Sequence, residues 1–124
     1  MGDSLRYKDW FEKAAHDLRG AEILMEHDGG NDLVAFHCQQ AMEKMLKGWL
    51  LKTTGELLDG YSLVFLCRKA TAAGAPLKGK LRDCAYVNQL YIETRYPSDS
   101  YMPVSEGEAR DCMDAARKLM ELLA

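Results

Sequence analysis

Four polar side chains gather on about one turn of a helix that the sequence predicts near the middle of the chain: Gln39, Gln40, Glu43 and Lys44. At roughly 100° per residue they fall opposite a broad apolar arc. Two amides, a carboxylate and an ammonium group could together bind a charged or hydrogen-bonding ligand. The cluster is therefore either a solvated helix face or the lining of a groove or partner-facing surface.

Two more polar residues interrupt the apolar stripes of predicted helices. Asp17 lies at the edge of the stripe in residues 5–26, and Asn88 lies in the middle of the stripe in residues 77–93. The second stripe consists of Leu77, Leu81, Cys84, Ala85, Tyr91 and Ile92. A buried polar group without a partner costs roughly 1–3 kcal/mol, so we expect both side chains to be hydrogen-bonded. Asn88 either bonds a neighbouring helix or lines a binding site.

The four cysteines do not form a recognisable metal or redox motif. None stands in a Cys-x-x-Cys pair, and none has a histidine at the spacing of a zinc ligand. We therefore predict buried free thiols in a reducing cytoplasm, with no metal and no cofactor, and leave a metal site or redox pair as the alternative. An apolar run of about 18 residues is absent, and no signal peptide is evident, which together predict a cytoplasmic protein without a membrane span.

The charge of the chain is unevenly distributed. The formal net charge is −3, but residues 61–95 hold six basic against two acidic side chains, a local charge of +4 that leaves −7 for the remainder. A basic middle segment on an acidic body is compatible with binding phosphate or an acidic partner. It is weaker support for nucleic-acid binding than a strongly basic chain would be.

The polar cluster must be positioned by a central helix, predicted over about residues 33–52. Its apolar arc is wide enough to face several neighbouring helices at once. Glu43 and Lys47 stand four residues apart on the predicted wet side, a favourable spacing. The arc consists of Val34, Ala35, Cys38, Ala41, Met42, Met45, Leu46 and Trp49.

Further helices are predicted on both sides of the central one. The first covers about residues 5–26, a short one follows a Ser62 cap, and another covers about residues 77–93 after Pro76. The last begins at a capping box of Ser105 and Glu108 and runs to about residue 123. Period-two alternation is absent, so we predict an all-α fold, an up-down four-helix bundle with an additional short helix, in a single domain over residues 1–124.

The order of these segments resembles the HEPN domain family over nearly the whole chain. The most specific features are the string Gln-Gln-Ala-x-Glu-Lys-x-Leu-Lys that begins at Gln39 and the tripeptide Arg95-Tyr96-Pro97. Supporting features are Trp10, Ala14, Asp17, Leu18 and Ala21, then Phe36, Tyr61-Ser62-Leu63 with Leu66, Leu90-Tyr91, and the alanine-rich last helix.

The resemblance implies a helical bundle that forms a homodimer. Many members of the family occur in prokaryotic toxin–antitoxin pairs beside a minimal nucleotidyltransferase. Active members cleave RNA without a metal, using an arginine and a histidine four to six residues later, brought together across the dimer. Others lack this pair and are thought to bind nucleotides or to serve as partner subunits.

Arg95 matches the arginine of the ribonuclease motif, but the histidine is replaced. Asp99, Ser100 and Tyr101 stand four, five and six residues after Arg95, and no histidine follows His37. General acid–base catalysis needs a group that exchanges a proton near neutral pH, which an ordinary serine or tyrosine does not. The histidine that the family places before Ser62 is replaced by Tyr61.

The main prediction is therefore a nucleotide- or partner-binding module of a toxin–antitoxin-like nucleotidyltransferase system. The planar guanidinium of Arg95 suits bidentate contacts with a phosphate or carboxylate. The predicted ligand-binding residues are Arg95, Tyr96, Asn88 and Lys44.

The alternative is a metal-independent ribonuclease. Arg95 would then stabilise the charge on the scissile phosphate, and Asp99 or Tyr101 would replace the missing base. A third interpretation is a purely structural interaction domain, in which Arg95 is a surface residue that pairs with Glu93 or Asp99.

Overall fold

A long central helix organises the molecule, as the apolar arc predicts. The computed structural model describes residues 2–60, 62–97, 99 and 103–124, and these form helices without any strand. The helices are α1 (Tyr7–Glu26), α2 (Asn31–Thr54), α3 (Leu63–Ala72), α4 (Leu81–Thr94) and α5 (Glu106–Leu123). Helix α2 contacts each of the other four, so the prediction of its central place is confirmed.

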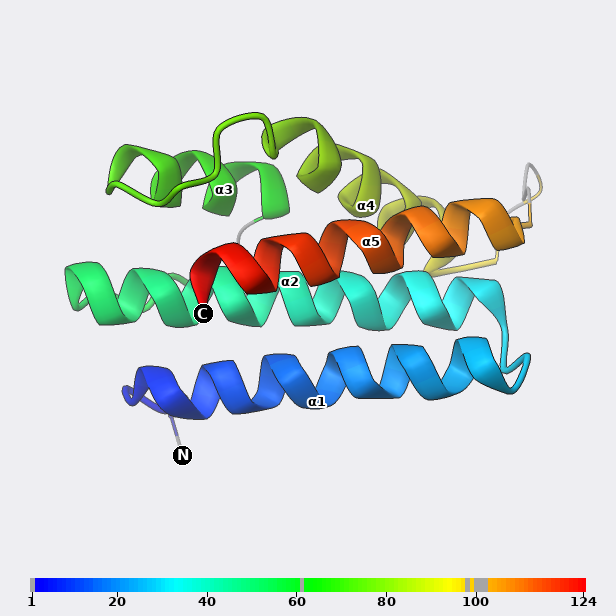
Figure 1. Ribbon diagram of the computed structural model, residues 1–124, viewed down its shortest axis with the longest axis horizontal. Helices are drawn as coiled ribbons and strands as arrows, with labels where there is room; N and C mark the ends of the chain where they lie inside the picture. Colours follow the sequence, from blue (N-terminus) through cyan, green and yellow to red (C-terminus); the bar gives the residue numbers. More distant parts are fainter. Residues whose placement is uncertain (1, 61, 98, 100–102) are drawn as a thin grey trace.

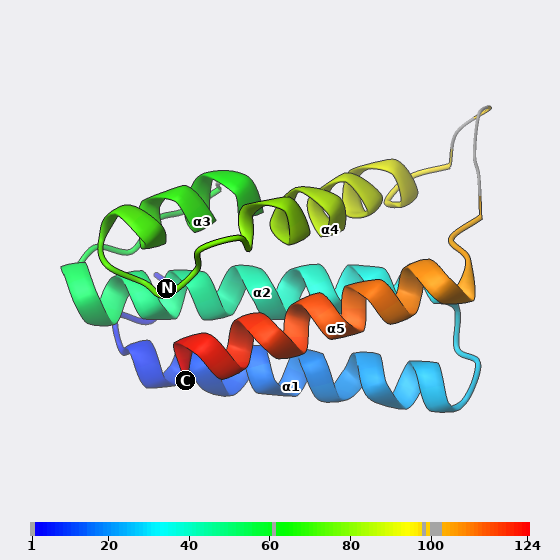
Figure 2. The same ribbon diagram turned by 45° about the horizontal axis from the view of Figure 1, so that its top comes forward.

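The helices form an up-down bundle to which the short α3 is added. Helices α1 and α2 lie antiparallel, α5 runs along the front of α2, and α3 and α4 lie above it (Figure 1). Turning the molecule shows α5 lying across α1 and α2, with α3 and α4 as a separate layer (Figure 2). The amide of Asn31 donates to the carbonyl oxygen of Val104 at 3.1 Å and joins the start of α2 to the segment before α5.

The predicted caps of α3 and α5 are confirmed. The Ser62 hydroxyl accepts a hydrogen bond from the backbone N–H of Phe65. At α5 the Ser105 hydroxyl accepts from the N–H of Glu108, whose carboxylate accepts from the N–H of Ser105. Each cap satisfies donors that the first helical turn leaves open.

The predicted start of α4 is wrong by about one turn. The helix begins at Leu81 and not at Leu77, because the residues after Pro76 form turns instead. The Lys80 N–H donates to the carbonyl of Leu77 at 3.0 Å, and Gly79 lies between them at φ +81°. This left-handed conformation is open to glycine and cannot continue an α-helix.

The N-terminal segment is also held differently from the prediction. Helix α1 begins at Tyr7, and its cap residue Arg6 makes no side-chain cap. Ser4 instead accepts a hydrogen bond from the Arg6 N–H at 3.0 Å and donates to Asp9 Oδ2 at 2.7 Å. These hydrogen bonds tie Ser4 to the first turn of α1.

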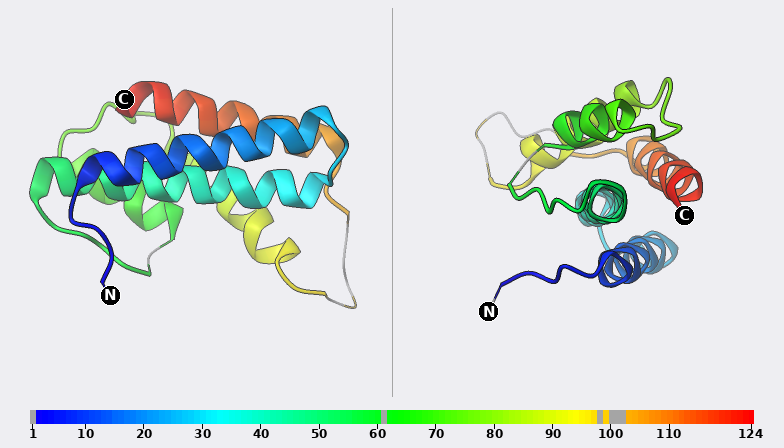
Figure 3. Two further views of the ribbon diagram at one scale, coloured as in Figure 1. Left: turned by 90° about the horizontal axis from the view of Figure 1, so that it is seen from below. Right: turned by 90° about the vertical axis from the view of Figure 1, so that its left-hand side faces the viewer.

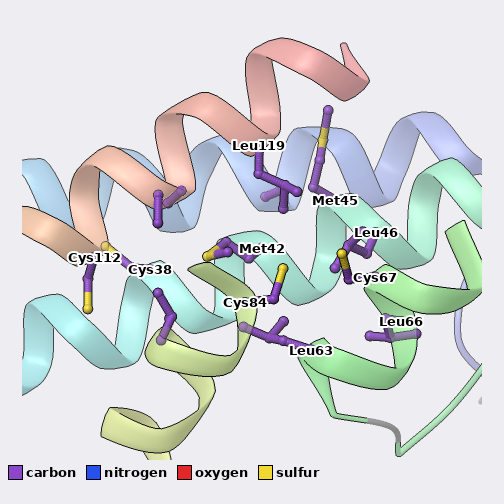
Figure 4. Packing of buried hydrophobic residues seen from close by; sticks show 14 of the residues in the cluster. Cys38, Met42, Met45, Leu46, Leu63, Leu66, Cys67, Cys84, Cys112 and Leu119 are labelled. Carbon is purple, nitrogen blue, oxygen red and sulfur yellow. The ribbon is translucent and has the colours of Figure 1, made fainter. Parts of the chain in front are cut away.

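The core contains all four cysteines as free, buried thiols, as predicted (Figure 4). Side chains from α2, α3, α4 and α5 meet in one apolar cluster around them. The Cys38 thiol donates to Met113 Sδ at 3.4 Å, and burial raises its pKa. Burial, aided by Asp111 and Glu108, raises the pKa of Cys112 to about 12.

Not every predicted core position is buried. Ile92 belongs to the predicted apolar stripe of α4 but is 56% exposed, and Ala85 is exposed as well. The core side of α4 is formed by Cys84, Val87 and Leu90. Cys84 belongs to the predicted stripe, whereas Val87 and Leu90 do not. Among the described helices, none is long and apolar enough to cross a lipid bilayer.

Candidate functional site

Arg95 follows the last turn of α4 and extends its guanidinium into solvent. Helix α4 ends at Thr94, and Pro97 prevents its continuation. Nη1 of Arg95 donates to the Tyr91 hydroxyl at 2.8 Å, one turn back on the same helix. The guanidinium carbon lies 5.0 Å from the ring centroids of both Tyr91 and Tyr96, a favourable cation–π distance.

The cation of Arg95 is available to an incoming anion. The hydrogen bond to the Tyr91 hydroxyl raises the pKa of Arg95 above its ordinary value, and electrostatic interaction with Tyr91 and Tyr96 adds to this. Among the described residues no carboxylate pairs with it. Glu93, one alternative partner, instead accepts a hydrogen bond from Gln89 at 2.8 Å.

An aromatic contact joins this end of α4 to α2. The rings of Tyr91 and Phe36 lie 5.8 Å apart between centroids, tilted by 32°. We call Phe36, Tyr91, Arg95 and Tyr96 the Arg95 surface. The C-terminal end of α4, which carries Tyr91, lies on the side of α2 that faces away from α5, and the N-terminal segment lies on this side as well (Figure 3, right).

A second group, the Asp17 network, joins the same stretch of α2 to α1. The Lys44 ammonium donates to Asp17 Oδ2 at 2.5 Å, and His37 Nδ1 lies 3.4 Å from Asp17 Oδ1. The Asp17 side chain is 17% exposed, so this carboxylate is partly buried, and it is hydrogen-bonded as predicted. The His37 ring also contacts Phe36 edge-on at 5.2 Å, which links the network to the Arg95 surface.

A third group, the Lys47 network, lies further along α2. Gln40 donates to Gln39 at 2.7 Å, Gln39 to Glu43 Oε1 at 3.2 Å, and Lys47 to Glu43 Oε2 at 2.7 Å. Asp59 lies 3.9 Å from the Lys47 ammonium. The prediction of a wet face is wrong for Gln39 and Lys47, which are 3% and 4% exposed. The connection after α2, which supplies Asp59, covers this side of the helix.

The predicted ligand-binding residues do not share one pocket. Arg95 and Tyr96 lie together at the end of α4, whereas Lys44 lies on the α1 side of α2, in the Asp17 network. The Asn88 side-chain oxygen accepts a hydrogen bond from the Leu63 N–H at 3.3 Å and so supports the start of α3.

Of the two residues predicted to replace the missing base, only Asp99 belongs to the described part of the chain. Asp99 is exposed and makes no described ion pair with Arg95. Tyr101 and Tyr61 lie outside the described residues. In the described part of the chain, no group of three or more His, Cys, Asp or Glu side chains is arranged to hold a metal ion.

Sequence reasoning assigned no binding role to three residues that join these groups: Phe36, His37 and Tyr91. Their spacing could have pointed to them, because Phe36 stands one helical turn before Gln40, and His37 stands two turns before Lys44. Residues at these spacings share one face of a helix. Tyr91 stands four residues before Arg95, the spacing at which helical side chains meet. The contacts between helices could not be read from spacing within one helix.

The family model that matches this chain is that of the HEPN domain, over residues 7–124. The crystal structure of TT1696 from Thermus thermophilus is similar, with a TM-score of 0.75, 26% identity, and 97% of each chain covered. The crystal structure of ST0689, an archaeal HEPN homologue, has a TM-score of 0.73 and 26% identity, covering 95% of this chain and 94% of that one. A search of curated proteins found no match.

Proposed function

This chain belongs to the HEPN domain family, and from that premise we propose that it is a binding module whose Arg95 surface takes the phosphate group of a nucleotide. The observation that carries the proposal is the exposed Arg95 cation, held by the Tyr91 hydroxyl and flanked by two tyrosine rings. Among the described residues, no carboxylate has to be displaced from this cation by an incoming anion.

The chemistry of the surface suits a planar ligand that carries phosphate. Of the five N–H donors of an arginine, the Tyr91 hydroxyl takes one, and no other residue in the described part of the chain takes a further one. Such donors suit phosphate oxygens. Tyr96 is 67% exposed and offers a ring face on which a base can stack. The hydrogen bond and the rings hold the guanidinium in place, which lowers the entropy lost on binding.

The proposed biological setting is a prokaryotic toxin–antitoxin-like system with a minimal nucleotidyltransferase as partner. We propose that the protein acts there as a homodimer in the cytoplasm. Family membership supports this setting, and so does the basic segment over residues 61–95, with its local charge of +4. Such a segment attracts phosphate-bearing ligands and acidic protein surfaces alike.

The test is titration of the purified protein with ATP by isothermal calorimetry. Arg95→Ala should weaken binding by about ten-fold or more, because it removes a bidentate, charge-assisted contact. Arg110→Ala is the matched control, since Arg110 is an exposed arginine whose partner, Glu106, lies on the same helix. Equal affinities for the wild type and Arg95→Ala would reject the Arg95 surface as the site.

A ribonuclease is the second candidate, and the Asp17 network favours it. A carboxylate hydrogen-bonded to an imidazole can orient that imidazole for proton transfer, and His37 stands in this relation to Asp17 at 3.4 Å. Through Phe36 and Tyr91, His37 is connected to Arg95.

Incubation with a structured RNA tests this second candidate. Cleavage by the wild type, lost in both Arg95→Ala and His37→Ala, would establish the enzyme with His37 in place of the motif histidine. Intact RNA after prolonged incubation with the wild type would reject it.

A further inference from the structure

A cleft with a volume of about 810 Å³ lies apart from the Arg95 surface, between the N-terminal segment, the first half of α1 and Lys44 of α2. This volume is in the range of small-molecule sites. One wall is fixed by two hydrogen bonds. The indole N–H of Trp10 donates to the Ser4 carbonyl at 2.8 Å, and the Ser4 hydroxyl donates to Asp9 at 2.7 Å.

One end of the cleft is acidic and is formed by Asp3, Asp9 and Glu12. Asp9 is engaged with Ser4, and its second contact, with Arg6, is a long one of 3.8 Å at the surface. Asp3 and Glu12 are exposed and make no ion pair with any described residue. This acidic end can therefore accept hydrogen bonds from a ligand amine without breaking an internal salt bridge.

The other end is basic and is formed by Lys13, His16 and Lys44. Lys13 and His16 are exposed and have no carboxylate partner in the described structure. Lys44 remains 28% exposed while it pairs with Asp17, so its charge is partly neutralised there. The basic end offers hydrogen-bond donors to a carboxylate or phosphate.

The two ends are separated along the axis of α1. With a rise of 1.5 Å per residue, Asp9 and His16 are about 10 Å apart along the helix. Trp10 follows Asp9 directly, is half-buried, and contributes an apolar surface beside the acidic end. The cleft therefore has acidic side chains toward the start of α1, basic side chains toward its middle, and an aromatic ring beside the acidic side chains.

We propose that this cleft is a second binding site, which takes a small zwitterionic ligand. The ligand's amine contacts the acidic end, its carboxylate or phosphate contacts the basic end, and its apolar body lies on Trp10. A ligand with only one charge would offer no opposite charge to the side chains at one end of the cleft, and it would therefore bind less tightly.

A matched set of three probes tests the charge pattern: 6-aminohexanoate, hexanoate and hexylamine. The readout is the indole N–H signal of Trp10 in ¹⁵N-labelled full-length protein, assigned with the variant Trp49→Phe. We expect saturable shifts with 6-aminohexanoate and binding about ten-fold weaker or more for each singly charged probe. Absence of a saturable shift with 6-aminohexanoate, or equal affinities for all three probes, would overturn the proposal.

Two variants separate this site from the Arg95 surface. Lys13→Glu reverses the charge at the basic end and should weaken 6-aminohexanoate binding by about five-fold or more. Arg95→Ala should leave 6-aminohexanoate binding unchanged even if it abolishes ATP binding, so the two proposals fail independently. An unchanged affinity in Lys13→Glu, with circular dichroism confirming its fold, would contradict the assigned ligand orientation.

Discussion

Asp17 lies on α1, but its side chain makes its contacts with residues of α2. It accepts hydrogen bonds from Lys44 and is in contact with His37, both on α2, while its side chain is only 17% exposed. Asp17→Ala would leave the Lys44 ammonium, 28% exposed, without its carboxylate. We expect the free energy of unfolding to fall by about 1–3 kcal/mol, measured by urea denaturation.

The exposed pair of Glu106 and Arg110 is the control for this prediction. Their side chains are 68% and 65% exposed, so Glu106→Ala should lower the free energy of unfolding by no more than about 1 kcal/mol. If Asp17→Ala proves as mild as this control, the Asp17 network does not hold α1 to α2.

The buried thiol of Cys112 should make the free energy of unfolding fall as the pH rises. Its pKa is raised to about 12 in the folded protein, from a value of 9.0 for an unperturbed thiol. Its stabilising contribution is therefore complete below about pH 9 and is lost as the pH rises toward 12, because only the unfolded chain releases this proton. Each pH unit in that window removes about 1.4 kcal/mol from the free energy of unfolding.

The measurement is urea unfolding of the wild type and Cys112→Ala at several pH values between 8 and about 11. Cys112→Ala should have a lower free energy of unfolding than the wild type at pH 8. Between about pH 9 and 11 it should lose about 1.4 kcal/mol less of that free energy per pH unit than the wild type does. Identical slopes would show that the thiol ionises equally in the folded and unfolded chains.

At this scale, sequence reasoning identified single residues but not their partners. Asp17 was correctly expected to be hydrogen-bonded, because it lies at the edge of an apolar stripe, and its carboxylate is partly buried. Its partners on α2 could not be predicted, since they depend on the rotation of one helix against another. Asn88 was correctly expected to bond a neighbouring helix or line a site, but that it supports the first turn of α3 was not foreseen.

At the scale of elements, the close packing of α1 on α2 depends on Gly48. A Cβ at this position would lie 2.8 Å from Phe11 Cδ1 and 2.9 Å from Trp10 Cβ, closer than real contacts allow. Gly48→Ala should therefore lower the free energy of unfolding by about 1–3 kcal/mol, although alanine is the better helix former. Thermal unfolding of the purified variant measures this.

Gly20 provides the matched control inside α1. The nearest atom to a Cβ placed there is Nδ1 of His37 at 4.0 Å, so the added methyl group meets no obstacle. Gly20→Ala should stabilise the protein by about 0.5–1 kcal/mol through helix propensity alone. Stabilisation by both substitutions would mean that α1 and α2 are further apart than described.

Element boundaries were predictable where side chains set them. Ser62 and Ser105 mark the starts of α3 and α5 because their hydroxyls satisfy the first free N–H groups. The start of α4 was not predictable from Pro76, because a proline tolerates the first turn of a helix without requiring one. The backbone conformation of Gly79 decides that boundary.

At the scale of the whole molecule, amphipathic patterns determine the bundle but leave the site open. The apolar arc of α2 predicts a helix with neighbours on several sides, and α1, α3, α4 and α5 occupy them. Which polar residues stay exposed depends on the connections between helices. Lys47 is buried, with Asp59 of the connection after α2 3.9 Å from its ammonium, and nothing in the helix pattern of α2 predicts this.

The remaining prediction concerns self-association, which we proposed as a homodimer. Ile92 and Tyr96 stand four residues apart at the end of α4 and are 56% and 67% exposed, beside the Arg95 cation. An apolar and aromatic surface with an arginine has the composition favoured at protein interfaces. If this end of α4 forms the dimer contact, Ile92→Glu should convert a dimer to a monomer over micromolar concentrations in sedimentation velocity.

Ile23→Glu tests whether any exposed isoleucine would have this effect. Ile23 is 43% exposed, but it lies on α1, and its substitution should leave the dimer intact. A wild-type protein that stays monomeric at high concentration contradicts the homodimer itself. Dimers that survive Ile92→Glu but dissociate in Ile23→Glu would move the contact to α1. The Arg95 surface would then lie outside the dimer contact.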